Sequence, residues 1–213
     1  MRTEKRNFDK DAAAWDENPA RVKLAQDVAE AIARRRVLTP DMEAMDFGCG
    51  TGLLTLHLQP KVRSIVGVDS SQGMLDILDV KIARLNLANV NTRLVDLDKG
   101  DVLEGRYDLV VSSMTLHHIR DIAVLLDRFR QVLAPGGSLA LADLDSEGGL
   151  FHSDNTGVFH FGFDRATLRR ALKDAGFEGI EDTTAAEVVK PTATGEIRRF
   201  TVFLMTGRKR SEE

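Results

Sequence analysis

Residues 44–52 read AMDFGCGTG, and this segment constrains the fold more than any other part of the chain. A short apolar run meets the acid Asp46 and then a glycine at every second position. The loop residues are Gly48, Cys49, Gly50 and Gly52. Glycine lets the backbone turn sharply and approach a ligand without a Cβ atom in the way. Because the apolar residues 53–56 are typical of a helix start, we expect a strand, a ligand-binding turn and a helix N-terminus in succession.

A second acid follows at the end of the next apolar run. Residues 64–68 form a short run rich in β-branched side chains, and Asp69 follows it, 17 residues after Gly52. An acid at the end of the second strand of such a unit can accept hydrogen bonds from both hydroxyls of a ribose. Dinucleotide-binding folds use the same acid, so Asp69 supports a nucleoside ligand without specifying which. The residue three after Gly50 is Leu53, which breaks the G-x-G-x-x-G spacing of those folds.

Short apolar runs and helical patterns alternate along most of the chain. We expect strands near residues 42–47, 64–68, 90–95, 107–112 and 137–143, with helices near residues 52–58, 71–86 and 121–133. An earlier helix begins at Asn18-Pro19 and runs to about Arg36. After a long polar loop, residues 145–160, a helix capped by Asp164 precedes two strands near 179–189 and 197–206. Such alternation indicates a parallel sheet covered by helices on both faces.

Taken in order, these segments resemble the class I methyltransferases that depend on S-adenosylmethionine (SAM). The match rests on the glycine loop, Asp69, Asp96 after residues 92–95, and the segments 107–113 and 133–139. The resemblance implies a Rossmann-like, doubly wound α/β fold with seven strands, mostly parallel, and an antiparallel hairpin at the C-terminal end. It also implies SAM as the cofactor and S-adenosylhomocysteine as its product.

The resemblance assigns cofactor contacts to residues at the strand ends. The glycine loop would pass the methionine part of SAM, Asp69 would take the ribose, and Asp96 would meet the adenine amino group. Met74 and Leu97 would flank the adenine, although ordinary core packing explains both equally well. The expected cofactor-binding residues are Asp46, Gly48, Cys49, Gly50, Gly52, Asp69, Ser70, Met74, Asp96, Leu97, Ser112 and Ser113.

Candidate residues for contact with the methyl acceptor lie after the fourth expected strand, in the N-terminal arm and beside the long loop. A base is needed only if the acceptor carries a proton that must leave, and His117 or His118 could take one. The simpler interpretation is that one histidine faces solvent and the other forms a hydrogen bond within the protein. Trp15 in the N-terminal arm and His160 beside the long loop are candidates for substrate contact or closure. The spacing of His152, Asp154 and His160 matches no zinc signature, so we expect no metal.

Composition limits the function classes. The 213 residues fit one domain, which we divide into an arm (1–38), a SAM-binding domain (39–207) with a loop insertion near 145–160, and a charged tail (208–213). A net charge of −4 gives no electrostatic footprint for nucleic acid. The chain has one cysteine and shows neither a signal peptide nor an apolar run long enough to cross a bilayer. We therefore expect a cytoplasmic protein without membrane or nucleic-acid partners.

The leading hypothesis is a SAM-dependent methyltransferase that acts on a small molecule by in-line displacement. The segment after the fourth expected strand, residues 112–115, lacks the pattern of nucleobase amino-methylating enzymes, and Cys49 does not follow a proline as a cytosine-methylating nucleophile would. A SAM-binding sensor or scaffold without activity would show the same cofactor residues. A nicotinamide-dependent oxidoreductase is a third hypothesis, disfavoured by the glycine spacing and by the terminal strand pair.

Overall fold

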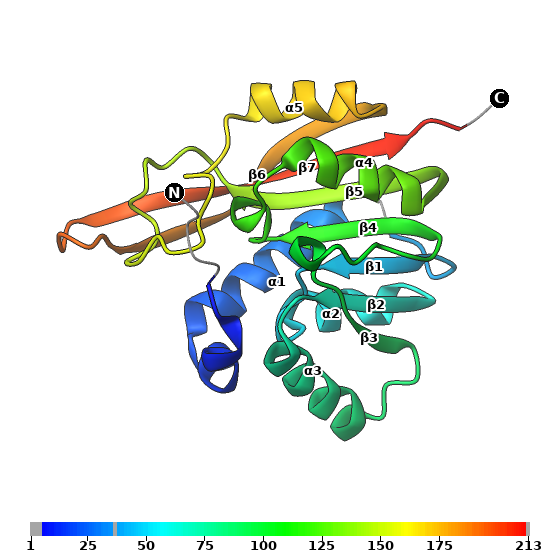
Figure 1. The fold of residues 1–213 in the computed structure, drawn as a ribbon, viewed down its shortest axis with the longest axis horizontal. Helices are drawn as coiled ribbons and strands as arrows, with labels where there is room; N and C mark the ends of the chain where they lie inside the picture. The colour runs from blue at the N-terminus through cyan, green and yellow to red at the C-terminus, as the bar shows by residue number, and fades with distance from the viewer. Residues whose placement is uncertain (1–5, 36–37, 212–213) are drawn as a thin grey trace.

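The structure is a computed structural model that describes residues 6–35 and 38–211. A seven-stranded sheet with the order β3-β2-β1-β4-β5-β7-β6 forms its centre (Figure 1). The strands are β1 (Glu43–Phe47), β2 (Ser64–Asp69), β3 (Val90–Leu94), β4 (Tyr107–Ser113), β5 (Leu133–Leu144), β6 (Phe177–Pro191) and β7 (Ile197–Lys209). Strands β1 to β5 pair in parallel, and β7 lies antiparallel between β5 and β6. The predicted fold class is confirmed.

Helices follow most of the parallel strands, as the alternation predicts. They are α1 (Pro19–Arg34), α2 (Leu53–Leu58), α3 (Gln72–Leu85), α4 (Ile122–Val132) and α5 (Arg165–Asp174). The expected caps are present: the side chain of Asn18 accepts from the N–H of Ala20, and that of Asp164 from the N–H of Thr167. The expected end of the first helix at Arg36 and the outermost residues of the expected arm and tail lie outside the described residues.

Two apolar layers cover the sheet. On one face α1 and α2 pack on strand residues such as Leu109, and on the other α4 and α5 pack on residues such as Val110. Since consecutive strand residues point to opposite faces, a run buried throughout needs helices on both sides. The order of the strands reverses between β1 and β4, which places a ligand crevice beyond the carboxyl ends of these two strands.

Strands β5 and β7 are longer than the sequence indicates. Strand β5 begins at Leu133, which pairs with Tyr107 before an irregularity in register. Strand β7 continues to Lys209, since Arg208 pairs with Ser138 of β5 and Lys209 pairs with Phe177 of β6. Two residues that the sequence places in a charged tail therefore belong to the sheet.

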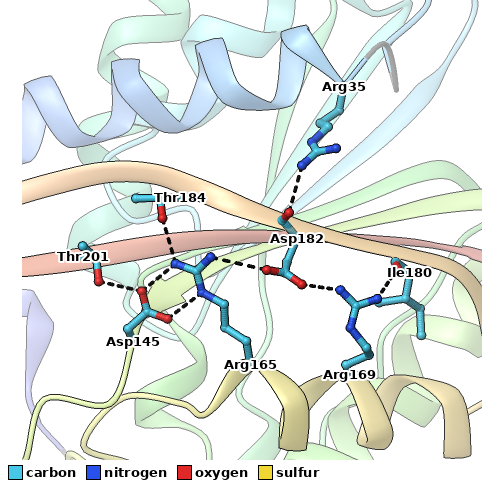
Figure 2. Close-up of polar contacts among 8 residues, drawn as sticks. All are labelled: Arg35, Asp145, Arg165, Arg169, Ile180, Asp182, Thr184 and Thr201. Atoms are coloured by element: carbon cyan, nitrogen blue, oxygen red, sulfur yellow. Dashed lines mark hydrogen bonds and ion pairs between the residues drawn. The ribbon is translucent and has the colours of Figure 1, made fainter.

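A polar network ties the start of the long loop to the terminal hairpin (Figure 2). The guanidinium of Arg165 donates two hydrogen bonds of 2.7 Å to Asp145, and a third of 3.3 Å to Asp182 on β6. Thr201 on β7 also donates to Asp145, at 2.6 Å. Burial raises the pKa of Asp145, but the bonds from Arg165 and Thr201 outweigh it, so the pKa lies below its usual value. The network fixes α5 and the first residue of the loop against β6 and β7.

In the part of the chain that the structure describes, no helix combines the length and the apolar character that crossing a bilayer needs.

Candidate functional site

The carboxyl ends of β1, β2 and β4 open into a cavity of about 510 Å³. Its wall combines the glycine loop after β1, the turn after β4, part of the N-terminal arm and part of the long loop. Of the residues expected from the sequence, the following line it: Trp15, Asp46, Gly48, Cys49, Gly50, Asp69, Ser70, Met74, Asp96, Leu97, Ser113, His117 and His118. The fold thus brings the expected donor and acceptor residues to one space.

The glycine loop is held by the second strand. Backbone N–H groups of Gly48 and Cys49 donate to the carbonyl of Val68 at 2.7 and 3.1 Å, and that of Gly50 donates to the carboxylate of Asp69 at 2.8 Å. At Gly50 the backbone is left-handed, with φ of 54°, and the nearest atom to an added Cβ would be the Met74 sulfur at 3.9 Å. This open space lets a ligand approach the backbone, which fits the SAM moiety that the loop is expected to hold.

Two acids stand at the same end of the cavity. Asp46 is buried, and its carboxylate accepts a 2.6 Å hydrogen bond from the hydroxyl of Thr55. Burial raises the pKa of Asp46 to about 7, and the charge of Asp69 adds to the effect. Burial also raises the pKa of the Cys49 thiol, so this side chain stays protonated and fills space in the turn.

Three expected site residues lie outside the cavity wall. Gly52, with φ of 81°, begins α2, and a Cβ there would overlap Leu78. The hydroxyl of Ser112 donates to the carbonyl of Phe47 at 2.8 Å, inside the sheet. The Nε2 atom of His160 donates to the carbonyl of Ile119 at 2.9 Å, an interaction that fixes the long loop. These three residues hold the elements that carry the cavity wall and do not line the cavity themselves.

A buried carboxylate orients one of the two candidate histidines. The Nδ1 atom of His117 lies 2.7 Å from Oδ1 of Asp143, at the end of β5. A carboxylate accepts the Nδ1 proton, which leaves Nε2 as the basic nitrogen of the neutral ring. No hydrogen bond from this Nε2 to any described residue is present. His117 can therefore act as a proton acceptor.

The two histidines beside His117, His118 and His152, have lowered pKa values. Nδ1 of His118 donates to the carbonyl of Gly157 at 2.7 Å, and burial lowers the pKa of His118 to about 4. Burial also lowers the pKa of His152, on the long loop, to about 3. The rings of His117 and His118 lie 4.2 Å apart between centroids, and those of His117 and His152 lie 5.0 Å apart. Both neighbours stay neutral near pH 7 and form one wall around His117.

The turn that carries these histidines begins at a strained residue. Met114, which follows β4 and lines the cavity, has φ of 56°, a conformation that non-glycine residues rarely adopt. Its backbone N–H donates to the carbonyl of Ala142 at 2.8 Å. Strain of this kind gathers at functional sites, where the surrounding structure holds it in place.

The N-terminal arm closes one side of the cavity. Asp9 accepts hydrogen bonds from the Ser71 hydroxyl at 2.6 Å and from the Gly73 N–H at 2.9 Å. Asp16 accepts from the Thr51 hydroxyl at 2.6 Å and forms an ion pair with Lys81. Thr51 lies within the glycine loop, and Ser71 and Gly73 closely follow Asp69, so the arm carrying Trp15 is fastened beside these two features.

Several residues of this site are not among those predicted from the sequence. Asp143 ends a strand just as Asp69 does, a signal that could have been used. His152 lies in a loop without periodicity, and Lys190 lies in a hairpin far along the chain. Their positions depend on tertiary packing. Among the described residues, no three histidine, cysteine or acidic side chains are grouped as metal ligands would be.

Comparisons with known proteins identify the type of domain. Residues 20–182 match the family described as "Methyltransferase domain". An uncharacterised methyltransferase of Schizosaccharomyces pombe is 35% identical over 155 residues, which make up 66% of this chain and 55% of that protein. A ubiquinone biosynthesis O-methyltransferase of Nitrobacter winogradskyi is 27% identical over 132 residues, 60% of this chain and 50% of that protein. The chain spans about half the length of these curated relatives.

A solved structure shows the same fold over almost the whole chain. The crystal structure of a SAM-dependent methyltransferase from Aquifex aeolicus superposes with a TM-score of 0.68 at 19% sequence identity. The alignment covers 94% of this chain and 97% of that chain.

Proposed function

The chain belongs to the class I SAM-dependent methyltransferases, and we propose that it methylates a small molecule bound beside His117. The observation that carries this proposal is the single cavity that joins the glycine loop and Asp69 to the histidines. When bound, SAM supplies a methyl group on a sulfonium, which an acceptor atom displaces in line. A cavity of about 510 Å³ suits a donor together with a small acceptor.

On the donor side we propose a division of roles among the wall residues. The residues that would hold SAM are Asp46, Gly48, Cys49, Gly50, Asp69, Ser70, Met74, Asp96, Leu97 and Ser113. The backbone around Gly50 would face the methionine part, and Asp69 would bind the ribose. Gly52 and Ser112 would not contact SAM but would hold the start of α2 and the pairing of β4 with β1. The arm would exclude water, with Trp15 as part of the cover.

On the acceptor side we propose that His117 removes a proton. Asp143 fixes the tautomer that leaves Nε2 basic, and it stabilises the ring when Nε2 takes up a proton. His118 would instead shape the pocket, since its Nδ1 atom is committed to Gly157 and its pKa is low. An acceptor hydroxyl or amine suits a site with a base, and the O-methyltransferase among the relatives favours oxygen.

The test is a transfer assay with methyl-labelled SAM against separate metabolite, protein and nucleic-acid fractions. We expect the label in the metabolite fraction, and the replacement His117→Gln to reduce transfer by about a hundredfold or more while SAM still binds. Label only in protein or nucleic acid would contradict the small-molecule acceptor. Binding of SAM without transfer to any fraction would favour the sensor or scaffold hypothesis. The family match gives no support to a nicotinamide-dependent enzyme.

A further inference from the structure

Positive charge gathers in the cavity beside the histidines. Arg6 and Arg21 from the N-terminal region and Lys190 from β6 line this part of the wall. Arg6 forms an ion pair with Asp11, with 2.8 Å between Nη2 and Oδ2. Within residues 6–35 and 38–211, neither Arg21 nor Lys190 forms an ion pair with a carboxylate. Asp11 and Glu147 act on these two charges only from beyond ion-pair distance.

Lys190 is held in a fixed position toward the cavity. Its ammonium donates to the carbonyl of Phe151 at 2.6 Å and lies 4.4 Å from the centroid of the Phe151 ring. An ammonium has three donors, so two remain. The acid Glu147 lies near enough to act on this charge, but its Oε2 accepts from the backbone N–H groups of Leu150 and Phe151. This carboxylate oxygen therefore binds the loop backbone, and the Lys190 ammonium forms no ion pair with Glu147.

Arg21 adds a second positive charge on an aromatic surface. Its guanidinium carbon lies 3.8 Å from the centroid of the Trp15 ring, and one N–H donates to the Trp15 carbonyl at 3.3 Å. Burial lowers the pKa of Lys190, and the charge of Arg21 lowers it further. Two half-buried cations that repel one another are costly to hold together unless an anion joins them.

An unsatisfied histidine lies in the same region. The Nε2 atom of His152 is buried without a hydrogen-bond partner among the described residues. The ring is close enough to Lys190 and Arg6 for both charges to disfavour its protonation. This part of the wall thus presents cations and a neutral ring, beside Trp15 and Phe151, to a space of ligand size.

From this arrangement we propose that the methyl acceptor is an acid: Lys190 binds its carboxylate or phosphate, and Arg21 strengthens the attraction. This inference rests on the proposed function, since it assigns the chemical class of the molecule to be methylated. The apolar part of the acid lies against the aromatic rings of Trp15 and Phe151, which favours an aromatic or otherwise apolar body.

The experiment compares charged and neutral ligands on the protein saturated with S-adenosylhomocysteine. The probes are hydroxylated aromatic carboxylic acids, the matching aryl phosphates, and the primary amides of the same acids. Binding is measured by ligand-observed NMR titration. We expect the best acid to bind at least about tenfold more tightly than its amide, because a charge-assisted hydrogen bond contributes that much. Whichever of the two anions binds more tightly identifies the charged group.

Variants of Lys190 attribute the preference to this side chain. Lys190→Gln should remove the preference for the acid, and Lys190→Arg should restore most of it. Lys173→Gln, at an exposed position of α5, serves as the matched control and should behave like the wild type. S-adenosylhomocysteine should bind all four proteins equally.

Three results would overturn the inference. In the first, the acids bind no better than the amides, or neither binds. In the second, Lys190→Gln keeps the preference for the acid. In the third, Lys190→Gln weakens the binding of S-adenosylhomocysteine, which would mean that Lys190 binds the carboxylate of the methyl donor. Failure of S-adenosylhomocysteine to bind the wild type would instead contradict the proposed function itself.

Discussion

The imidazole of His117 and the carboxylate of Asp143 meet at 2.7 Å in a contact where their side chains are 2% and 0% exposed. The pair joins the turn after β4 to the end of β5, two strands that lie side by side in the sheet. Asp143 also accepts a 2.7 Å hydrogen bond from the N–H of Leu144. The acid is thereby fixed from two directions, and it in turn fixes the ring.

Asp143→Asn tests this relationship directly. The amide can donate to Nδ1, so we expect His117 to change to the tautomer with the proton on Nε2. In that tautomer Nε2 cannot remove a proton from the methyl acceptor. The ¹⁵N spectrum of the histidine rings reports the tautomer without any acceptor. Once the acceptor is known, the transfer rate should fall by about a hundredfold or more while SAM affinity is kept. An unchanged tautomer would show that Asp143 does not orient the ring.

Gly50 and Gly52 should respond differently to alanine. At Gly52 the left-handed backbone and the overlap with Leu78 should lower the free energy of unfolding by about 2–4 kcal/mol. At Gly50 the added methyl group has space, so Gly50→Ala should lose less stability but weaken SAM binding more. Thermal unfolding and calorimetry distinguish the two effects. If SAM affinity fell in proportion to the lost stability in both variants, the result would argue against a ligand at Gly50.

SAM affinity should depend on the protonation of Asp46. With its pKa raised to about 7 by burial, about half of this carboxyl is protonated at neutral pH. A positively charged ligand favours the ionised form, so SAM binding should release protons and become tighter from pH 6 to pH 8. Calorimetry in two buffers of different ionisation enthalpy measures the release. Asp46→Asn should reduce both effects, and a wild-type affinity that does not change with pH would contradict this role.

The same shift predicts how the stability of the unliganded protein depends on pH. The folded protein holds a proton on Asp46 that the unfolded chain loses above its ordinary pKa of 3.8. The contribution of Asp46 to the free energy of unfolding is therefore fully present below pH 4 and is lost as the pH rises to about 7. The difference between wild type and Asp46→Asn in urea titrations at pH 5 and pH 8 isolates this contribution.

The arm should loosen when its acidic anchors are removed. Asp16 binds the hydroxyl of Thr51 and the ammonium of Lys81, so Asp16→Asn should speed hydrogen exchange in residues 8–17. Asp27→Asn removes an exposed ion pair with Lys23 within α1 and serves as the control. The difference from the wild type should shrink as salt is added, because salt screens the pair with Lys81 that only the wild type has. Equal exchange in both variants would mean that other contacts hold the arm.

Much of the cavity wall beside the glycine loop could be predicted from sequence, because its residues stand at strand ends. Asp46 and Asp69 each close an apolar run, and parallel strands bring such positions to one edge of the sheet. Asn18 and Asp164 were predictable as helix caps for a different reason: a cap acts on backbone N–H groups two or three residues away, so the neighbouring sequence indicates it.

The acceptor side could not be predicted in the same way. It joins a turn, a loop and a hairpin that are distant along the chain, and Lys190 reaches the cavity only because β6 pairs with β7 at the end of the sheet. The charge pattern likewise hid the pairing of Lys209, since a basic run near the C-terminal end is typical of a solvated tail. The loop anchor Arg165 depends on Asp145 and Asp182, contacts that helix periodicity does not reveal.

A crystal structure of the protein with S-adenosylhomocysteine would show directly whether the glycine loop holds the nucleoside. We expect density for the nucleoside along residues 48–52 and at Asp69, with the space beside His117 and Lys190 left open for an acceptor. Density at another place, or side chains that fill the space along residues 48–52, would contradict this expectation.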